Sequence, residues 1–293
     1  FDYADSQILF NKSFDLVSNL NDKFNSRNIT MRPKRKNKLN QHVKLGNKYV
    51  GKDFPTYIIA EGGLNHNGDI QIAKKLIDQA KKINCNAIKF QTFSKNSRVS
   101  NKVKFANYVE KADGLREDLN EIFNKNKLHD KEIKNLFKYA KKKKIEIFST
   151  PFDTESLKKL EKIGVNFYKL ASVDIVNLPL IKEIGNTGKP LIMSTGMSDL
   201  SRVLDAVEAF RETGNKNLIL LHCLSSYPAE SSEMNLNCIK SLKDQFKIPV
   251  GLSDHFPGIE ISLMAIGVGA NIIERHFTLD KRMEGPDHIL SSE

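Results

Sequence analysis

Eight short runs of β-branched and other apolar residues recur between residues 57 and 277, and each run ends in polar residues. Segments of helical period separate the runs, and one of them places these apolar residues on a single face: Ile72, Ala73, Leu76, Ile77, Ala80 and Ile83. Nearly continuous apolar strands that alternate with helices indicate a parallel sheet covered by helices. Eight such units predict an α/β protein with a closed (β/α)8 barrel.

The expected strands are residues 57–61, 87–93, 145–152, 167–172, 190–196, 218–223, 249–255 and 271–277. An open doubly wound sheet is the alternative, but the stretch EGGLNHNG after the first run lacks the GxGxxG dinucleotide fingerprint. Few residues follow the eighth run, so we expect the eighth helix to be missing or truncated. Either the chain is cut there, or an amphipathic stretch near residues 8–20 covers the side of the barrel that the eighth helix would otherwise cover.

The first part of the chain differs from the rest in composition. Residues 1–42 are rich in Asn, Lys and Ser and are expected to be an N-terminal extension, partly helix and partly linker, before a barrel over residues 43–293. The net charge is +11, with dense basic runs at 32–38 and 141–144. The second run is typical of a solvated helix end, and the first lacks interleaved aromatic residues, so nucleic-acid binding is only weakly indicated.

Cysteine usage and hydropathy indicate in which cellular compartment the protein is expected. Three scattered cysteines cannot form a disulfide framework, which favours a reducing compartment. The sequence holds no apolar run of the roughly 18 residues needed to span a bilayer and no signal-peptide pattern. We therefore expect a cytoplasmic enzyme without membrane insertion.

Barrel enzymes of this kind build their active sites at the C-terminal ends of the strands. All eight of these ends are polar here. Because an unpaired buried polar group costs about 1–3 kcal/mol, such a ring predicts a ligand site, with a mutual hydrogen-bond network as the alternative. The candidates are Glu61, Asn65, His66, Lys89, Gln91, Ser149, Thr150, Lys169, Ser172, Ser194, Thr195, His222, Ser225, Tyr227, Ser253, Asp254, His255, Glu274 and His276.

Two kinds of chemistry stand out among these candidates. Lys89 and Lys169 lie on alternate strands and, with the surrounding hydroxyls, predict a cup for a phosphate or carboxylate; pairing with nearby carboxylates is the alternative. His255 and His276 end adjacent strands and could share one divalent cation, or they could be hydrogen-bonded structural residues. Glu274 and Arg275 are either a salt-bridged pair at the barrel rim or part of the catalytic apparatus.

A set of ordered motifs adds a resemblance to these inferences. The chain from about Val43 onward resembles the N-acetylneuraminate (sialic acid) synthase family, which includes legionaminate and pseudaminate synthases and spore-coat polysaccharide homologues. The segment KLGNKYVG is similar to the hairpin that precedes the first strand in that family. The motifs that carry the resemblance are IIAEGGLNHNGD, AIKFQTF, FSTPFD, NLPLI, KPLIMSTGM, LLHCLSSYPA, VGLSDH and IIERHFTLDKRMEGPDH.

The resemblance implies a barrel enzyme that condenses phosphoenolpyruvate with an N-acetylmannosamine-type amino sugar, giving a nine-carbon 2-keto acid and phosphate. It implies catalytic roles for Glu61, His255 and His276, with Glu61 as general base and the two histidines as ligands of Mn²⁺ or Mg²⁺. Ser225, Tyr227 and Asp287 match further substrate-binding positions, the last two as sugar contacts. The positions that match the phosphoenolpyruvate site are Lys89, Thr150, Lys169, Ser172, Ser194 and Ser253.

Departures from the family pattern leave the acceptor sugar open. Gly62 replaces the usual isoleucine after Glu61, and Val173 with Asp174 replaces the common Gly-Glu pair. The family's C-terminal antifreeze-like domain, which reaches the partner subunit's active site, is not present in these residues, so a homodimer is implied only when that domain is there. The alternatives are another barrel that condenses phosphoenolpyruvate with an aldehyde, or a non-catalytic sugar-phosphate-binding barrel.

Overall fold

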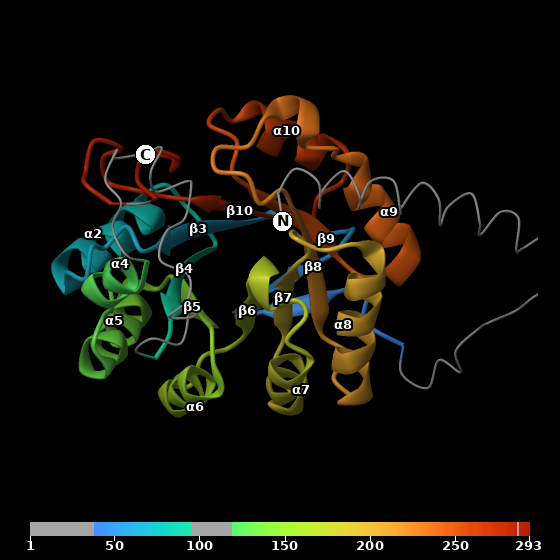
Figure 1. Ribbon diagram of the computed structural model, residues 1–293, viewed down its shortest axis with the longest axis horizontal. Helices are drawn as coiled ribbons and strands as arrows, with labels where there is room; N and C mark the ends of the chain where they lie inside the picture. Colours follow the sequence, from blue (N-terminus) through green and yellow to red (C-terminus); the bar gives the residue numbers. More distant parts are fainter. Residues whose placement is uncertain (1–37, 95–118, 286) are drawn as a thin grey trace, which may run out of the picture.

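The protein folds as a closed barrel of eight parallel strands in the order β10-β3-β4-β5-β6-β7-β8-β9, with helices outside it (Figure 1). The computed structural model describes residues 38–94, 119–285 and 287–293. The prediction of a (β/α)8 barrel is confirmed. Residues 1–37, which hold most of the expected N-terminal extension and the stretch near 8–20, lie outside the described residues.

All eight expected strands are present, with ends within a few residues of the prediction. The barrel strands are β3 (Tyr57–Gly63), β4 (Ala87–Thr92), β5 (Glu146–Pro151), β6 (Tyr168–Leu170), β7 (Leu191–Ser194), β8 (Leu218–Cys223), β9 (Val250–Asp254) and β10 (Ile272–His276). Strand β10 pairs with β3 in parallel and closes the barrel, so that His276 lies beside Glu61.

The helices are capped by residues that suit their ends. Asp69, Asp153 and Asp199 accept backbone hydrogen bonds in the first turns of α2, α6 and α8. Ile83, expected on the buried face of α2, is instead its C-cap and is 53% exposed. The helices are α2 (Ile70–Lys82), α4 (Leu119–Lys125), α5 (Asp130–Lys143), α6 (Thr154–Ile163), α7 (Leu178–Asn186), α8 (Leu200–Glu212), α9 (Asn237–Phe246) and α10 (Glu260–Gly267), with 3₁₀ turns η1 (Ser172–Asp174) and η2 (Ser231–Glu233).

The described residues after β10 contain no helix. They form turns instead, and Phe277 and Ser292 form an isolated parallel bridge. Asn65, after β3, donates hydrogen bonds to the Phe277 carbonyl oxygen and the Ser291 hydroxyl. These contacts hold the last segment across the C-terminal end of the barrel, beside the polar strand ends.

A short antiparallel hairpin closes the opposite end of the barrel. Strands β1 (Val43–Leu45) and β2 (Lys48–Val50) are joined by a two-residue turn in which Gly46 has a φ of 59°, a conformation that suits glycine. Val43, Leu45 and Val50 are buried in one cluster with apolar residues of the barrel strands. The barrel interior beside the hairpin is therefore apolar.

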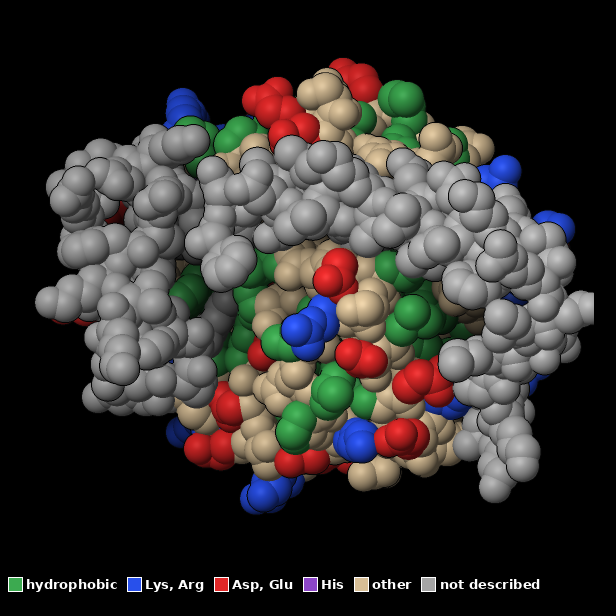
Figure 2. Space-filling view, turned by 45° about the vertical axis from the view of Figure 1, so that its right-hand side comes forward, with side chains coloured by type: hydrophobic (Ala, Val, Ile, Leu, Met, Phe, Trp, Pro, Cys, Tyr) green, Lys and Arg blue, Asp and Glu red, His purple; other side chains and the backbone are tan. Residues whose placement is uncertain are grey.

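In the described part of the chain, no helix is long and apolar enough to cross a membrane. Cys85, Cys223 and Cys238 are all free. On the face shown in Figure 2, acidic and basic side chains of the described residues lie interspersed rather than gathered by sign.

Candidate active site

Side chains along a strand alternate between its two faces, so every second residue points into the barrel. These inward residues form an apolar layer and a polar layer. On β10, Ile272 belongs to the apolar cluster sealed by the hairpin, and Glu274 and His276 follow on the same face toward the C-terminal end. Strands β3 and β5 repeat the pattern, with Ile59 below Glu61 and Phe148 below Thr150. The strands therefore carry apolar residues near the hairpin and polar residues at the open end.

All twelve predicted site residues come from these strand ends or from the loops that follow them. The set is Glu61 (β3), Lys89 (β4), Thr150 (β5), Lys169 (β6), Ser172 (η1), Ser194 (β7), Ser225 and Tyr227 (after β8), Ser253 (β9), His255 (after β9), His276 (β10) and Asp287 (after β10). The structure thus brings together residues that are spread over most of the sequence.

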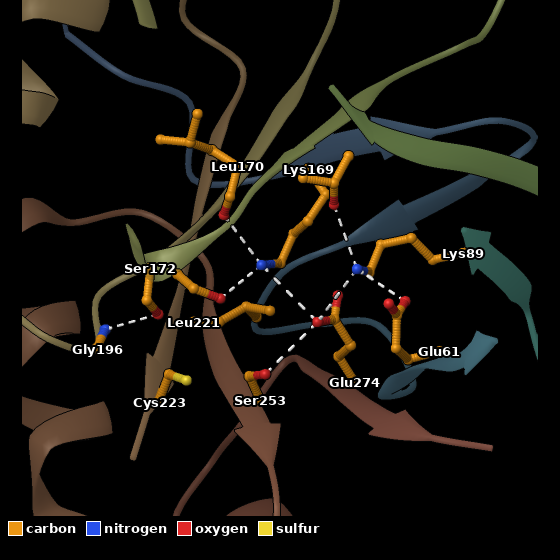
Figure 3. A network of polar contacts seen from close by, with 12 residues as sticks. Glu61, Lys89, Lys169, Leu170, Ser172, Gly196, Leu221, Cys223, Ser253 and Glu274 are labelled. Carbon is orange, nitrogen blue, oxygen red and sulfur yellow. Dashed lines mark hydrogen bonds and ion pairs between the residues drawn. The ribbon is translucent and has the colours of Figure 1, made fainter. Parts of the chain in front are cut away.

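Two buried lysines and two buried carboxylates form the centre of the site (Figure 3). The Lys89 ammonium nitrogen lies 2.7 Å from a Glu61 carboxylate oxygen and 3.3 Å from the Thr150 hydroxyl. One Glu274 oxygen lies 3.8 Å from the Lys89 nitrogen and 3.7 Å from the Lys169 nitrogen. The alternatives considered for the lysines therefore coexist, because they pair with carboxylates and also line the polar cup.

The Lys169 end of the network is lined by hydroxyl groups. Lys169 donates hydrogen bonds to the Ser194 hydroxyl at 2.6 Å and to the Leu170 carbonyl oxygen at 3.0 Å. The Gly196 amide donates to the Ser172 hydroxyl at 3.1 Å. A Cβ at Gly196 would lie 2.5 Å from the Ser225 hydroxyl oxygen, so this glycine permits the close approach of the loops around the cup.

The two carboxylates differ in their affinity for a proton. Burial raises the pKa of Glu61; Lys89 partly opposes this effect, and the neighbouring Glu274 adds to it. Burial would also raise the pKa of Glu274, but Lys169 and Lys89 outweigh it and hold the pKa below its ordinary value. Environments that separate the pKa values of two carboxyl groups in this way suit one of them to proton transfer, here Glu61.

The predicted metal ligands lie side by side, with imidazole centroids 5.5 Å apart. The His255 Nδ1 atom bonds the Leu224 carbonyl oxygen at 2.8 Å, so Nδ1 carries a proton. Burial lowers the pKa of His255, but Cys223 outweighs this effect and raises it, so Nε2 becomes an electron-pair donor once its own proton is lost. Burial lowers the pKa of His276 to about 4, which keeps its imidazole neutral. Among the described residues, the buried Nδ1 of His276 has no hydrogen-bond partner, and it lies 3.8 Å from an Asp287 carboxylate oxygen.

These features fit a divalent cation held by one nitrogen of each imidazole. Within the described residues, no group of three or more His, Cys, Asp or Glu side chains is arranged to hold a metal ion. A cation bound here would therefore have most of its coordination positions open to water or substrate. Tyr227 packs against His255 with centroids 4.1 Å apart, at the side where the loop after β8 meets the histidines.

Three residues at the site were not given roles from the sequence. Gln91 donates a hydrogen bond to the second Glu61 oxygen at 3.2 Å. Burial raises the pKa of the Cys223 thiol, but hydrogen bonds and charge from His255, with Ser172 and Lys169, bring it down to about 7. Glu274 is the third. The alternation of inward residues on β10 was the available signal for Glu274, since it precedes the inward His276 by two positions.

The hypothesis that Glu274 and Arg275 form a salt-bridged pair is wrong. As consecutive residues of a strand, they point to opposite faces of the barrel wall. Arg275 forms an ion pair of 2.7 Å with Asp254 and donates to the Phe256 carbonyl oxygen. Asp254, a strand-end candidate, is thus part of the wall's outer ion pair and not of the cup.

One cavity of the protein lies away from this site. Its volume is about 460 Å³, and it lies where α7 and α8 end, lined by Asn40, Gly188, Thr213 and Asn215 among others. None of the predicted site residues lines it. The fold and the cup together define a barrel enzyme with a cationic, hydroxyl-lined site beside a histidine pair.

Comparisons with known proteins agree with that class. The model of the NeuB family matches residues 76–293. N,N'-diacetyllegionaminic acid synthases are 45% identical over 81% of this chain and 72% of the relative in Campylobacter jejuni, and 40% identical over 84% and 70% in Legionella pneumophila. The crystal structure of the N-acetylneuraminic acid synthetase of Leptospira borgpetersenii has a TM-score of 0.77 and 38% identity, covering 87% of this chain and 85% of that one.

The chain belongs to the NeuB family. It is therefore an enzyme of the synthase-like transferase type, as the sequence motifs predicted.

Proposed function

We propose that the protein condenses phosphoenolpyruvate with an N-acetylmannosamine-type amino sugar to give a nine-carbon 2-keto acid and inorganic phosphate. The observation that carries the proposal is the buried Lys89–Glu274–Lys169 arrangement within hydrogen-bonding hydroxyls, next to a pair of imidazoles. Phosphoenolpyruvate has a carboxylate and a phosphate group, and two separated lysines suit these two anionic groups. The names of the relatives, which are synthases of nine-carbon acidic sugars, support the same reaction.

Each of the two lysines, together with a neighbouring hydroxyl group, would bind one of the two anionic groups of phosphoenolpyruvate. Lys89 and Thr150, which are hydrogen-bonded to each other, would receive one anionic group near Glu61. Lys169, with Ser194, would receive the other beside the Gly196 loop. The remaining predicted phosphoenolpyruvate contacts are Ser172 and Ser253, and Ser225 lies against the same glycine.

The chemistry forms one carbon–carbon bond and one carbon–oxygen bond from C2 to water, and it breaks the carbon–oxygen bond from C2 to phosphate. C3 of the enol attacks the aldehyde carbon of the open-chain sugar, the aldehyde oxygen takes a proton, and C2 acquires cationic character. Water adds to C2 and loses a proton, and the resulting tetrahedral intermediate expels phosphate to leave the 2-keto group. Glu61, whose pKa is raised by burial, is placed to hold and transfer the proton in these steps.

His255 and His276 would hold Mn²⁺ or Mg²⁺, which when bound supplies Lewis-acid polarisation of the sugar aldehyde. Tyr227 packs against His255, and Asp287 lies near His276, so both border the place where the sugar would bind. We assign these two residues to the sugar. A homodimer and a cytoplasmic location remain predictions from the resemblance and from the composition.

A phosphate-release assay on the full-length protein tests the proposal. The substrates are phosphoenolpyruvate and a panel of N-acetylmannosamine, its 6-phosphate, and diacetamido hexoses, with Mn²⁺ or with chelator. We expect metal-dependent release with one sugar, abolished in His276→Ala, and a product mass equal to that of a nine-carbon keto acid. Release with a four- or five-carbon aldehyde instead would favour the seven- or eight-carbon acid synthases. Phosphoenolpyruvate binding without release with any acceptor would favour a binding protein.

A further inference from the structure

The function of Glu274 is not explained by the proposed contacts to substrate or metal. Its side chain crosses the polar layer of the barrel from β10 toward lysines on β4 and β6, as Figure 3 shows. It is 5% exposed. Its Oε1 atom accepts from the Ser253 hydroxyl at 3.5 Å, and its buried Oε2 atom has no hydrogen-bond partner within the part of the chain that the structure describes.

The two lysine contacts of Glu274 are nearly equal in length, at 3.8 Å to Lys89 and 3.7 Å to Lys169. Both exceed the ordinary range of a charge-assisted hydrogen bond, about 2.7–2.9 Å. Each lysine makes its short contacts elsewhere, Lys89 with Glu61 and Lys169 with Ser194. Glu274 therefore attracts both ammonium groups without binding either of them closely.

This geometry has a consequence for two like charges in a buried site. Two ammonium groups repel each other strongly where water is excluded, and without a charge between them each would move toward its own neighbours. A central carboxylate oxygen offsets that repulsion and fixes the direction of both side chains. An incomplete hydrogen-bond set on a buried carboxylate is destabilising, so its presence calls for a role outside folding.

We propose that Glu274 is a positioning residue that holds Lys89 and Lys169 at the separation phosphoenolpyruvate requires for reaction. The inference rests on the proposed function, since it assigns the two lysines to the two anionic groups of one substrate. Glu274 lowers the net positive charge of the cup and thereby weakens simple anion binding. What it provides is orientation, and a misplacement of about 1 Å can lower a rate about a hundredfold.

The test separates binding from turnover. Glu274→Gln keeps the shape of the side chain and removes its charge. We expect kcat to fall about a hundredfold, while calorimetric titration without sugar gives a Kd for phosphoenolpyruvate and for inorganic phosphate that is unchanged or tighter. A merely structural role would instead weaken binding and lower Tm together. If kcat stays within about threefold of the wild type, the positioning role is wrong.

A second variant and a control keep the result decisive. Glu274→Asp keeps the charge but withdraws the carboxylate from both lysines, so it should fold and still lose kcat with phosphoenolpyruvate binding retained; wild-type kcat would overturn the inference. Glu146→Gln changes a half-buried carboxylate at the opposite end of β5, hydrogen-bonded to Asn166, and should leave kcat unchanged.

No turnover by the wild type with any amino sugar would overturn the proposed function and this inference together, whereas equal turnover by wild type and Glu274→Gln overturns the inference alone.

Discussion

The Glu61 carboxylate and the Lys89 ammonium group form an ion pair of 2.7 Å in the barrel interior, with 2% and 5% of their side chains exposed. Burial of two charges is unfavourable, and their mutual attraction offsets this cost only while both are present. The pair is therefore sensitive to the loss of either partner. It also lies beside Glu274, so the loss of Lys89 leaves two carboxylates facing a single lysine.

The first prediction concerns stability. Lys89→Met leaves a buried carboxylate without its partner and should lower the free energy of unfolding by about 3–5 kcal/mol, measured by urea denaturation. Adding Glu61→Gln to Lys89→Met should restore part of that loss, because the unpaired charge is removed. Lys143→Met breaks the exposed pair with Asp78 and should leave stability nearly unchanged. Equal effects of the two lysine substitutions would contradict the importance of burial.

The second prediction concerns the close approach at Gly196. A Cβ there would lie 2.5 Å from the Ser225 hydroxyl oxygen, 2.8 Å from that of Ser172 and 2.9 Å from the Cys223 carbonyl oxygen. Gly196→Ala should therefore push these groups apart and raise the KM for phosphoenolpyruvate at least about tenfold, by the loss of roughly one hydrogen bond to a charged group. Gly267→Ala, where a Cβ meets nothing within 4 Å, is the matched control. An unchanged KM in Gly196→Ala would place the anionic group assigned to Lys169 elsewhere.

The third prediction concerns metal binding, measured by calorimetric titration with Mn²⁺ in the absence of substrate. Only two imidazoles contribute to the candidate site, so the loss of either should weaken Mn²⁺ binding by more than the roughly ten- to hundredfold typical of a residue that merely supports a ligand. His255→Ala and His276→Ala are the test variants. His129→Asn, at the exposed N-cap of α5, should bind Mn²⁺ as the wild type does. Wild-type affinity in either alanine variant would remove that histidine from the ligand set.

The sequence predicted the barrel because its two periods, apolar runs and helical faces, are local properties of the chain. It predicted the site region because every strand end is polar and barrel topology brings those ends together. It did not identify the role of Glu274, since the lysines that Glu274 faces lie on strands far away in the sequence. The supposed pairing with Arg275 relied on sequence adjacency, which in a strand separates side chains. The departure of Ile83 from the buried face of α2 has a local cause, because the helix ends one residue earlier.

The last prediction concerns pH and His66, a buried strand-end candidate that the proposed mechanism does not use. Its Nδ1 atom accepts a hydrogen bond from the Gly68 amide, and its side chain lies beside Phe90. Burial lowers the pKa of His66 from 6.5 to about 4, although Asp69 opposes the shift. Folding therefore favours the neutral imidazole, and between these two values the unfolded chain binds the proton more tightly. The stability contributed by His66 is present above pH 6.5 and is lost as the pH falls toward 4.

The size of this effect can be measured by comparing the wild type with His66→Asn, whose amide oxygen can accept the same Gly68 hydrogen bond. Between pH 7.5 and pH 5.0 the wild type should lose about 2 kcal/mol more unfolding free energy than the variant, from urea denaturation at each pH. Other buried histidines are present in both proteins, so their titration cancels in the difference. Parallel pH profiles would mean that His66 is as easily protonated in the folded protein as in the unfolded chain, and its burial against Phe90 would then have no electrostatic consequence.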